Sequence, residues 1–225
     1  MTTAATRQDA PGADQARLPA LQRAANAAPD WATAAVFLWA WIAPQAWRET
    51  LVAELMLVML VEFILIHSAP FLGGLVLATS MPLPARLKAF GGFTVFYGLF
   101  IGAFAWSFQS WWPVFAFAWL LGAKLTAMLG SRRDDARERQ RRQGYWGASV
   151  GYYLLAVIAT LFLPVPEFGV TQHGARYGIS GSGSWVSNPH TVIAAGWLYF
   201  TLLALTKSLE RHAWWAGMQQ AEPSA

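Results

Sequence analysis

Long apolar runs separated by short polar segments make up most of the chain after residue 30. A membrane-spanning helix needs about 20 mostly apolar residues to cross a hydrocarbon core of about 30 Å. The pattern therefore predicts an all-α, polytopic transmembrane helical bundle, a single domain over residues 31–210. Its six predicted spans are residues 31–47, 50–69 with an extension to 80, 90–108, 111–130, 145–163 and 189–206.

Prolines affect the second and the last of these spans, among others. The run from Thr50 to Ser80 would be about 46 Å long as a helix, which is too long for one perpendicular crossing. Pro70 would clash with the Ile66 carbonyl, so we expect a kink or a break there. The last span has a favourable start, because Asn188 is a good N-cap residue and Pro189 fits the first helical position.

Composition favours a membrane protein over a soluble one. Hydrophobic residues make up 56% of the chain and charged residues only 12%, compared with roughly 25% charged residues in an ordinary soluble domain. Cysteine is absent, which excludes disulfides, thiolate metal sites and cysteine nucleophiles within this chain. Residues 1–30 are polar and rich in alanine, so we expect a disordered cytoplasmic tail there. Residues 211–225 are predicted to form a second cytoplasmic tail.

Lysine and arginine are unequally divided between the two sides that six spans would create. One side would hold 13 of them and the other only Arg48 and Arg176. Basic residues are retained in the cytoplasm during insertion, so both termini are predicted to be cytoplasmic, in the plasma (inner) membrane. The arginine-rich segment 131–144 carries side-chain charges that alternate in sign. This pattern favours a solvated helical extension beside anionic lipid headgroups over a nucleic-acid site.

Ionisable side chains inside the apolar runs are the main candidates for function. Glu62 would lie about 18 Å along the second span and Lys124 about 20 Å along the fourth, and both spans start from the outer side. We therefore expect a Glu62–Lys124 ion pair near the midplane, with His67 below it. Such a pair could be an interhelical clip without chemistry, and Lys124 could instead extend to the headgroups.

The predicted outer loop, residues 164–188, is long enough to be either functional or a flexible linker. One interpretation is a lid over the outer mouth of the bundle. The candidate side chains in and beside this loop are Glu167, His173, Arg176, Tyr177, Trp185 and His190.

Small residues four apart indicate close helix packing, within the chain or with a second copy. These pairs are Gly98 with Gly102 and Gly147 with Gly151. No spacing of histidines or carboxylates matches a metal-binding pattern, so we expect no metal and no cofactor.

Three classes of function fit this pattern. The favoured class is transport or sensing of a small solute or proton, with Glu62, His67 and Lys124 along the route. The second is an accessory subunit that binds another membrane protein. The least favoured is an intramembrane enzyme acting on lipid, with His173 or His190 as acid or base.

Overall fold

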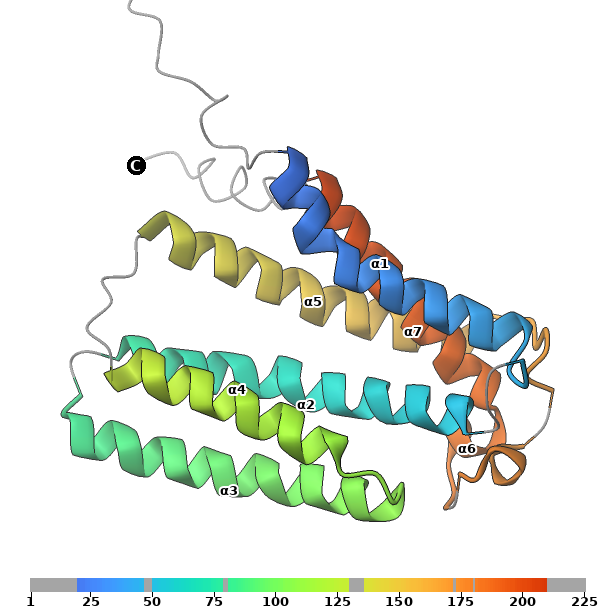
Figure 1. The fold of residues 1–225 in the computed structure, drawn as a ribbon, viewed down its shortest axis with the longest axis horizontal. Coiled ribbons are helices and arrows are strands. Elements are labelled where there is room, and N and C mark those ends of the chain that lie inside the picture. Colours follow the sequence, from blue (N-terminus) through green and yellow to red (C-terminus); the bar gives the residue numbers. More distant parts are fainter. Residues whose placement is uncertain are drawn as a thin grey trace, which may run out of the picture.

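The protein folds as a bundle of helices in the computed structural model, which describes residues 20–46, 50–78, 81–129, 136–171, 173–179 and 181–209 (Figure 1). The described part contains no strand, which confirms the all-α prediction. The long helices are α1 (Ala20–Ile42), α2 (Leu51–Leu77), α3 (Leu83–Ser107), α4 (Trp112–Leu129), α5 (Ala136–Phe162) and α7 (Pro189–Leu209). Two short elements, the 3₁₀ helix η2 (Gly174–Tyr177) and α6 (Ser184–Ser187), lie between α5 and α7.

Four of the described helices are long and apolar enough to cross a membrane: Leu51–Leu75, Leu83–Ser107, Gln143–Phe162 and Pro189–Leu209. The apolar part of α4, Trp112–Thr126, is shorter. Large apolar side chains cover much of the surface, and Trp119 and Phe162 are 83% and 82% exposed. Such a surface suits hydrocarbon rather than water. These observations support a membrane protein. The length and composition of the helices do not confirm six spans.

The helices extend beyond several of the predicted spans. α1 begins at Ala20, so residues 20–30 of the expected disordered tail are helical, and it ends at Ile42 rather than at residue 47. α3 begins at Leu83, seven residues before the predicted start. α5 begins at Ala136, as expected for a helical extension of the basic segment. A search for apolar runs finds only the part of a helix that lies in hydrocarbon, which explains why several predicted spans begin later than the helices do.

Pro70 does not break α2, which continues to Leu77. The prediction of a break at this position is therefore wrong. Proline cannot donate a hydrogen bond to the Ile66 carbonyl, but Trp146 of α5 donates one to it from Nε1 at 2.9 Å. The neighbouring helix thus supplies the donor that the proline removes.

The helices form two groups that share α2 (Figure 1). α1 and α5 pack against α7, whereas α3 and α4 pack against each other and against α2. The largest buried cluster joins α1, α2, α5 and α7. We call the end of the bundle that holds Ile42, Leu51 and Pro189 the cap end, and the opposite end, with Leu77 and Leu209, the basic end.

Residues 164–188, the cap, pack onto the cap end of the bundle. Trp41 donates a hydrogen bond from Nε1 to the Pro166 carbonyl at 2.9 Å, and its own carbonyl accepts one from the Gly169 amide at 3.0 Å. Val170, Tyr177 and Ile179 are buried in the main cluster. The described part of this segment is therefore an ordered, packed cover and not a flexible linker.

The glycines predicted to pack do not do so within the described part of the chain. A Cβ added at Gly98, Gly102, Gly147 or Gly151 would meet no described atom within 4 Å outside its own helix backbone. The close approach occurs at Gly196, where an added Cβ would overlap the ring of Phe37. Spacing identifies a small-residue face, but it does not identify what covers that face.

Candidate functional site: a polar cluster inside the bundle

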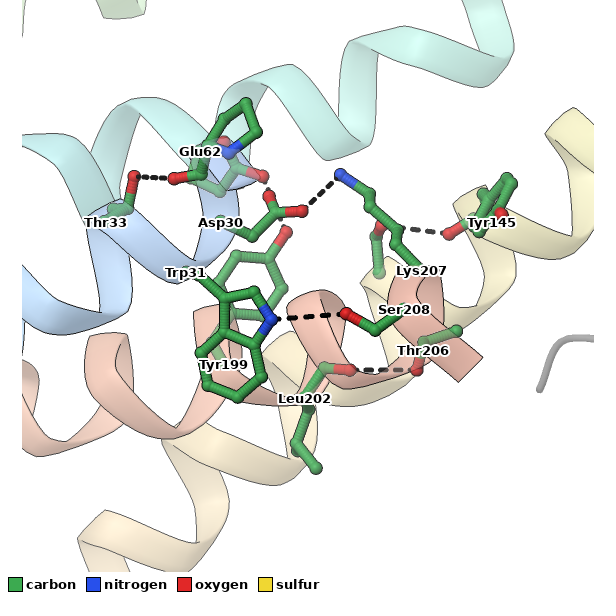
Figure 2. Close-up of polar contacts among 12 residues, drawn as sticks. Asp30, Trp31, Thr33, Glu62, Tyr145, Tyr199, Leu202, Thr206, Lys207 and Ser208 are labelled. Atoms are coloured by element: carbon green, nitrogen blue, oxygen red, sulfur yellow. Dashed lines mark hydrogen bonds and ion pairs between the residues drawn. The ribbon is translucent and has the colours of Figure 1, made fainter. Parts of the chain in front are cut away.

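Glu62 and Tyr199 form a hydrogen bond between the middles of α2 and α7. The Tyr199 hydroxyl donates to Glu62 Oε1 at 2.6 Å, and the tyrosine is fully buried (Figure 2). Glu62 lies about 16 Å from the start of α2 and Tyr199 about 15 Å from the start of α7. Both helices start at the cap end, so equal depth brings the two side chains together.

Tyr153 places α5 against the same pair. Its hydroxyl donates a hydrogen bond to the Met59 carbonyl of α2 at 2.9 Å. Its ring meets the Tyr199 ring edge-on, with centroids 5.5 Å apart. One turn away on α5, the Ser149 hydroxyl lies within reach of the Tyr199 hydroxyl. Three helices thus surround the carboxyl group of Glu62.

An ion pair continues the polar cluster toward the basic end. Lys207 of α7 lies with Nζ 2.6 Å from Oδ2 of Asp30 on α1, and the two side chains are 29% and 11% exposed (Figure 2). Both are near enough to Glu62 for their charges to act on it. Trp31 strengthens the junction of α1 with α7 by donating from Nε1 to the Ser208 hydroxyl at 3.2 Å.

Hydroxyl groups extend this polar region across to α5. The hydroxyls of Tyr152 and Thr206 share a hydrogen bond of 2.9 Å, and Ser149 donates to the Tyr145 carbonyl at 2.9 Å. Together with the Asp30–Lys207 pair, these groups place polar atoms on three helices between Glu62 and the basic end.

Toward the cap end the surroundings of the cluster change from polar to apolar. Phe37, Val192 and Ile193 are completely buried there, and Phe37 stacks on Phe200 with centroids 5.6 Å apart. Trp41 and the cap residue Val170 belong to the same buried cluster. Glu62 is therefore separated from the cap by a packed apolar layer, and its polar neighbours lie toward the basic end.

The structure brings only one of the three predicted intramembrane residues into this cluster. Glu62 is at its centre, whereas His67 is exposed, with Nδ1 3.0 Å from the Phe63 carbonyl. Lys124 is partly buried on α4, which packs against α2 and α3. The Glu62–Lys124 ion pair stays a prediction.

The candidates in and beside the cap have separate local surroundings. His173 is exposed and has Nδ1 2.8 Å from the Ser187 carbonyl. Tyr177 is buried and Trp185 packs against the main cluster. Glu167 and Arg176 are exposed, and His190 is partly buried in the first turn of α7. Within the described ranges, no three histidine, aspartate or glutamate side chains are grouped so as to hold a metal ion.

Sequence reasoning missed Asp30, Lys207, Tyr199 and Tyr153. Asp30 was assigned to a tail and Lys207 to the far side of the last span, because each lies at the edge of an apolar run. Tyr153 and Tyr199 were not considered, because a tyrosine ring is compatible with an apolar span. The sequence did contain one indication of this partner: Tyr199 carries a hydroxyl group in the middle of the last span, at the depth expected for Glu62.

The chain matches no protein-family model, no curated protein and no solved structure. The functional proposal therefore depends on the residues of the cluster.

Proposed function

We propose that this protein is a polytopic membrane protein that moves protons, alone or together with a small solute, by way of Glu62. In this proposal α1 and the shorter α4 cross the bilayer together with the four apolar helices, which makes six spans. The basic end faces the cytoplasm, in keeping with the distribution of lysine and arginine. The cap then lies on the outer side.

The observation that carries the proposal is the position of the Glu62 carboxyl group. An acidic side chain at the bilayer centre costs at least about 2.5 kcal/mol on insertion scales, and such residues commonly mark ion or proton pathways. In the described part of the chain, the hydrogen bond to Glu62 comes from the hydroxyl of Tyr199, which carries no charge. A carboxyl group whose hydrogen-bond donor is a neutral hydroxyl can take up and release a proton.

The polar neighbours of Glu62 support access from the cytoplasm. A proton would pass the Asp30–Lys207 pair and the hydroxyls of Ser149 and Tyr199 before it binds the Glu62 carboxylate. When Glu62 becomes a neutral carboxyl, the bond from Tyr199 is no longer charge-assisted and weakens. The apolar layer under the cap prevents direct passage outward, so release requires α1, α7 or the cap to move.

Proton flux into liposomes tests the proposal. The purified protein is reconstituted with a pH-sensitive dye inside, and a potassium diffusion potential drives the protons. We expect the wild type to acidify the interior faster than protein-free liposomes, and Glu62→Gln to reduce that rate by about tenfold or more. Tyr199→Phe keeps the carboxyl group and removes its donor, so its flux should be intermediate.

Glu54→Gln is the matched control, because Glu54 is the other carboxyl group on α2 and interacts with Thr50 near the cap end. Its flux should equal that of the wild type. A wild-type rate no higher than that of empty liposomes would overturn proton movement, and an unchanged rate in Glu62→Gln would remove Glu62 from the route.

A further inference from the structure

His67 is a polar side chain of α2 that the cluster does not use. Its ring contacts the Phe63 ring with centroids 4.1 Å apart and the ring planes tilted by 44°, and Nδ1 lies 3.0 Å from the Phe63 carbonyl. A carbonyl oxygen can only accept, so Nδ1 carries the proton of this bond. Among the described residues no hydrogen bond involves Nε2. Nε2, at the exposed edge of the ring, can therefore accept a hydrogen bond from a partner outside the described chain.

The depth of His67 indicates where that partner comes from. The residue lies about 24 Å along α2 from Leu51, and hence about 6 Å from the far edge of a hydrocarbon core of about 30 Å. This is the basic-end half of the membrane. Lipid ester and phosphate groups lie just beyond that edge, whereas the opposite headgroups are out of reach.

The exposed ring lies at the point where α2 and α5 separate. Phe63 bridges the two helices, because its ring contacts both His67 and, with centroids 5.8 Å apart, Tyr153 of α5. The bond from Trp146 to the Ile66 carbonyl closes the same seam. From there α2 and α5 diverge toward Leu77 and Ala136 (Figure 1). Phe63 and Trp146 remain 41% and 40% exposed.

We propose that this seam binds one phospholipid with an anionic headgroup. An acyl chain lies along the exposed rings of Phe63 and Trp146, and His67 Nε2 accepts a hydrogen bond from a headgroup hydroxyl. The headgroup is anionic because of the charge at this end of the bundle. Arg86 and Lys88 lie in the first turns of α3, and α5 starts with the arginine-rich sequence Ala-Arg-Glu-Arg-Gln-Arg-Arg. Juxtamembrane lysines and arginines attract anionic lipids.

The site is independent of proton movement through Glu62 and depends on the membrane orientation alone. His67 and Phe63 face the seam between α2 and α5, whereas Glu62 faces Tyr199 of α7. A Glu62 variant without flux could therefore still bind the lipid, and a protein that fails to bind it could still move protons.

Native mass spectrometry of protein from nanodiscs tests the proposal. The nanodiscs contain equal amounts of phosphatidylglycerol and phosphatidylcholine. After annular lipids are stripped by collisional activation, we expect one phosphatidylglycerol to remain on the wild type. His67→Leu should reduce that retained fraction about fivefold, in line with the loss of one hydrogen bond of about 1 kcal/mol. His190→Leu, a histidine change at the cap end, should leave it unchanged.

A photoactivatable phosphatidylglycerol with the reactive group on its acyl chain provides a second measurement on the wild type. Crosslinks should fall on peptides that contain Phe63–Phe71 or Gln143–Gly147. Equal retention of the two lipids, unchanged retention in His67→Leu, or crosslinks spread evenly over the exposed helices would each show annular lipid only and overturn the proposal.

Discussion

Trp146 donates its indole hydrogen bond to the carbonyl of Ile66, the acceptor that Pro70 leaves without an intrahelical donor. The contact joins α5 to α2 at 2.9 Å. Inside a membrane such a carbonyl finds little water, so a side chain from a neighbouring helix is the usual remedy. The proline of α2 and the tryptophan of α5 therefore act as one unit, although 76 positions separate them in the chain.

Trp146→Phe should destabilise the protein, because it retains an aromatic ring but leaves the Ile66 carbonyl unsatisfied. The expected loss is about 1–3 kcal/mol in the free energy of unfolding, measured in detergent. Trp106→Phe is the control, since Trp106 is 69% exposed at the end of α3. Pro70→Ala restores an amide donor to α2, so Trp146→Phe should cost much less in that background. An equal loss in both backgrounds would contradict the pairing.

Gly196→Ala should be more harmful than any glycine change on α3. Its new methyl group would overlap the ring of Phe37, which is fully buried and stacked on Phe200. Overpacking of this kind typically costs about 1–3 kcal/mol, which thermal unfolding can detect. Phe37→Leu should recover part of that loss in the double variant, because it removes the ring atoms that the methyl group meets.

Gly98→Ala is the matched control for this prediction. An added Cβ there has no described neighbour within 4 Å, and alanine favours a helix over glycine by about 0.5–1 kcal/mol. The control should be neutral or slightly stabilising. A destabilised Gly98→Ala would instead indicate that another molecule packs on α3.

The apolar pattern predicted the presence of the six long helices, and it placed the Glu62 carboxyl group near the middle of a span. It could not identify the partner. Hydropathy assigns a depth to each side chain but not the direction in which it points, and Lys124 was chosen because its depth matched. Tyr199 has the same depth and lies on the helix that packs beside α2 and α1. Which helices lie side by side depends on the tertiary fold, and it cannot be inferred from a single sequence.

The same limit applies to the ends of the helices. Asp30 lies within α1 and pairs with Lys207 across the helix pair, whereas the sequence alone presents it as a polar residue outside a span. The glycine pairs predicted to pack have no described neighbour within 4 Å of an added Cβ, while Gly196, which has no glycine four residues away, contacts Phe37. Each outcome was decided by a residue on another helix.

Whether α1 crosses the membrane can be settled by labelling, because the chain has no native cysteine. α1 is about 34 Å long by its 23 residues and lies along α7, itself apolar enough to span. A helix so closely paired with a spanning helix should cross with it. Leu21→Cys and Ala46→Cys lie near its two ends at exposed positions.

With a membrane-impermeant maleimide and intact cells, Ala46→Cys should be labelled directly and Leu21→Cys only after permeabilisation. Lys88→Cys and Thr171→Cys, both at exposed positions, provide the reference for the inner and the outer side. Labelling of Leu21→Cys in intact cells would place the start of α1 outside. In that case α1 would not cross, and the Asp30–Lys207 pair could not guard a cytoplasmic route to Glu62.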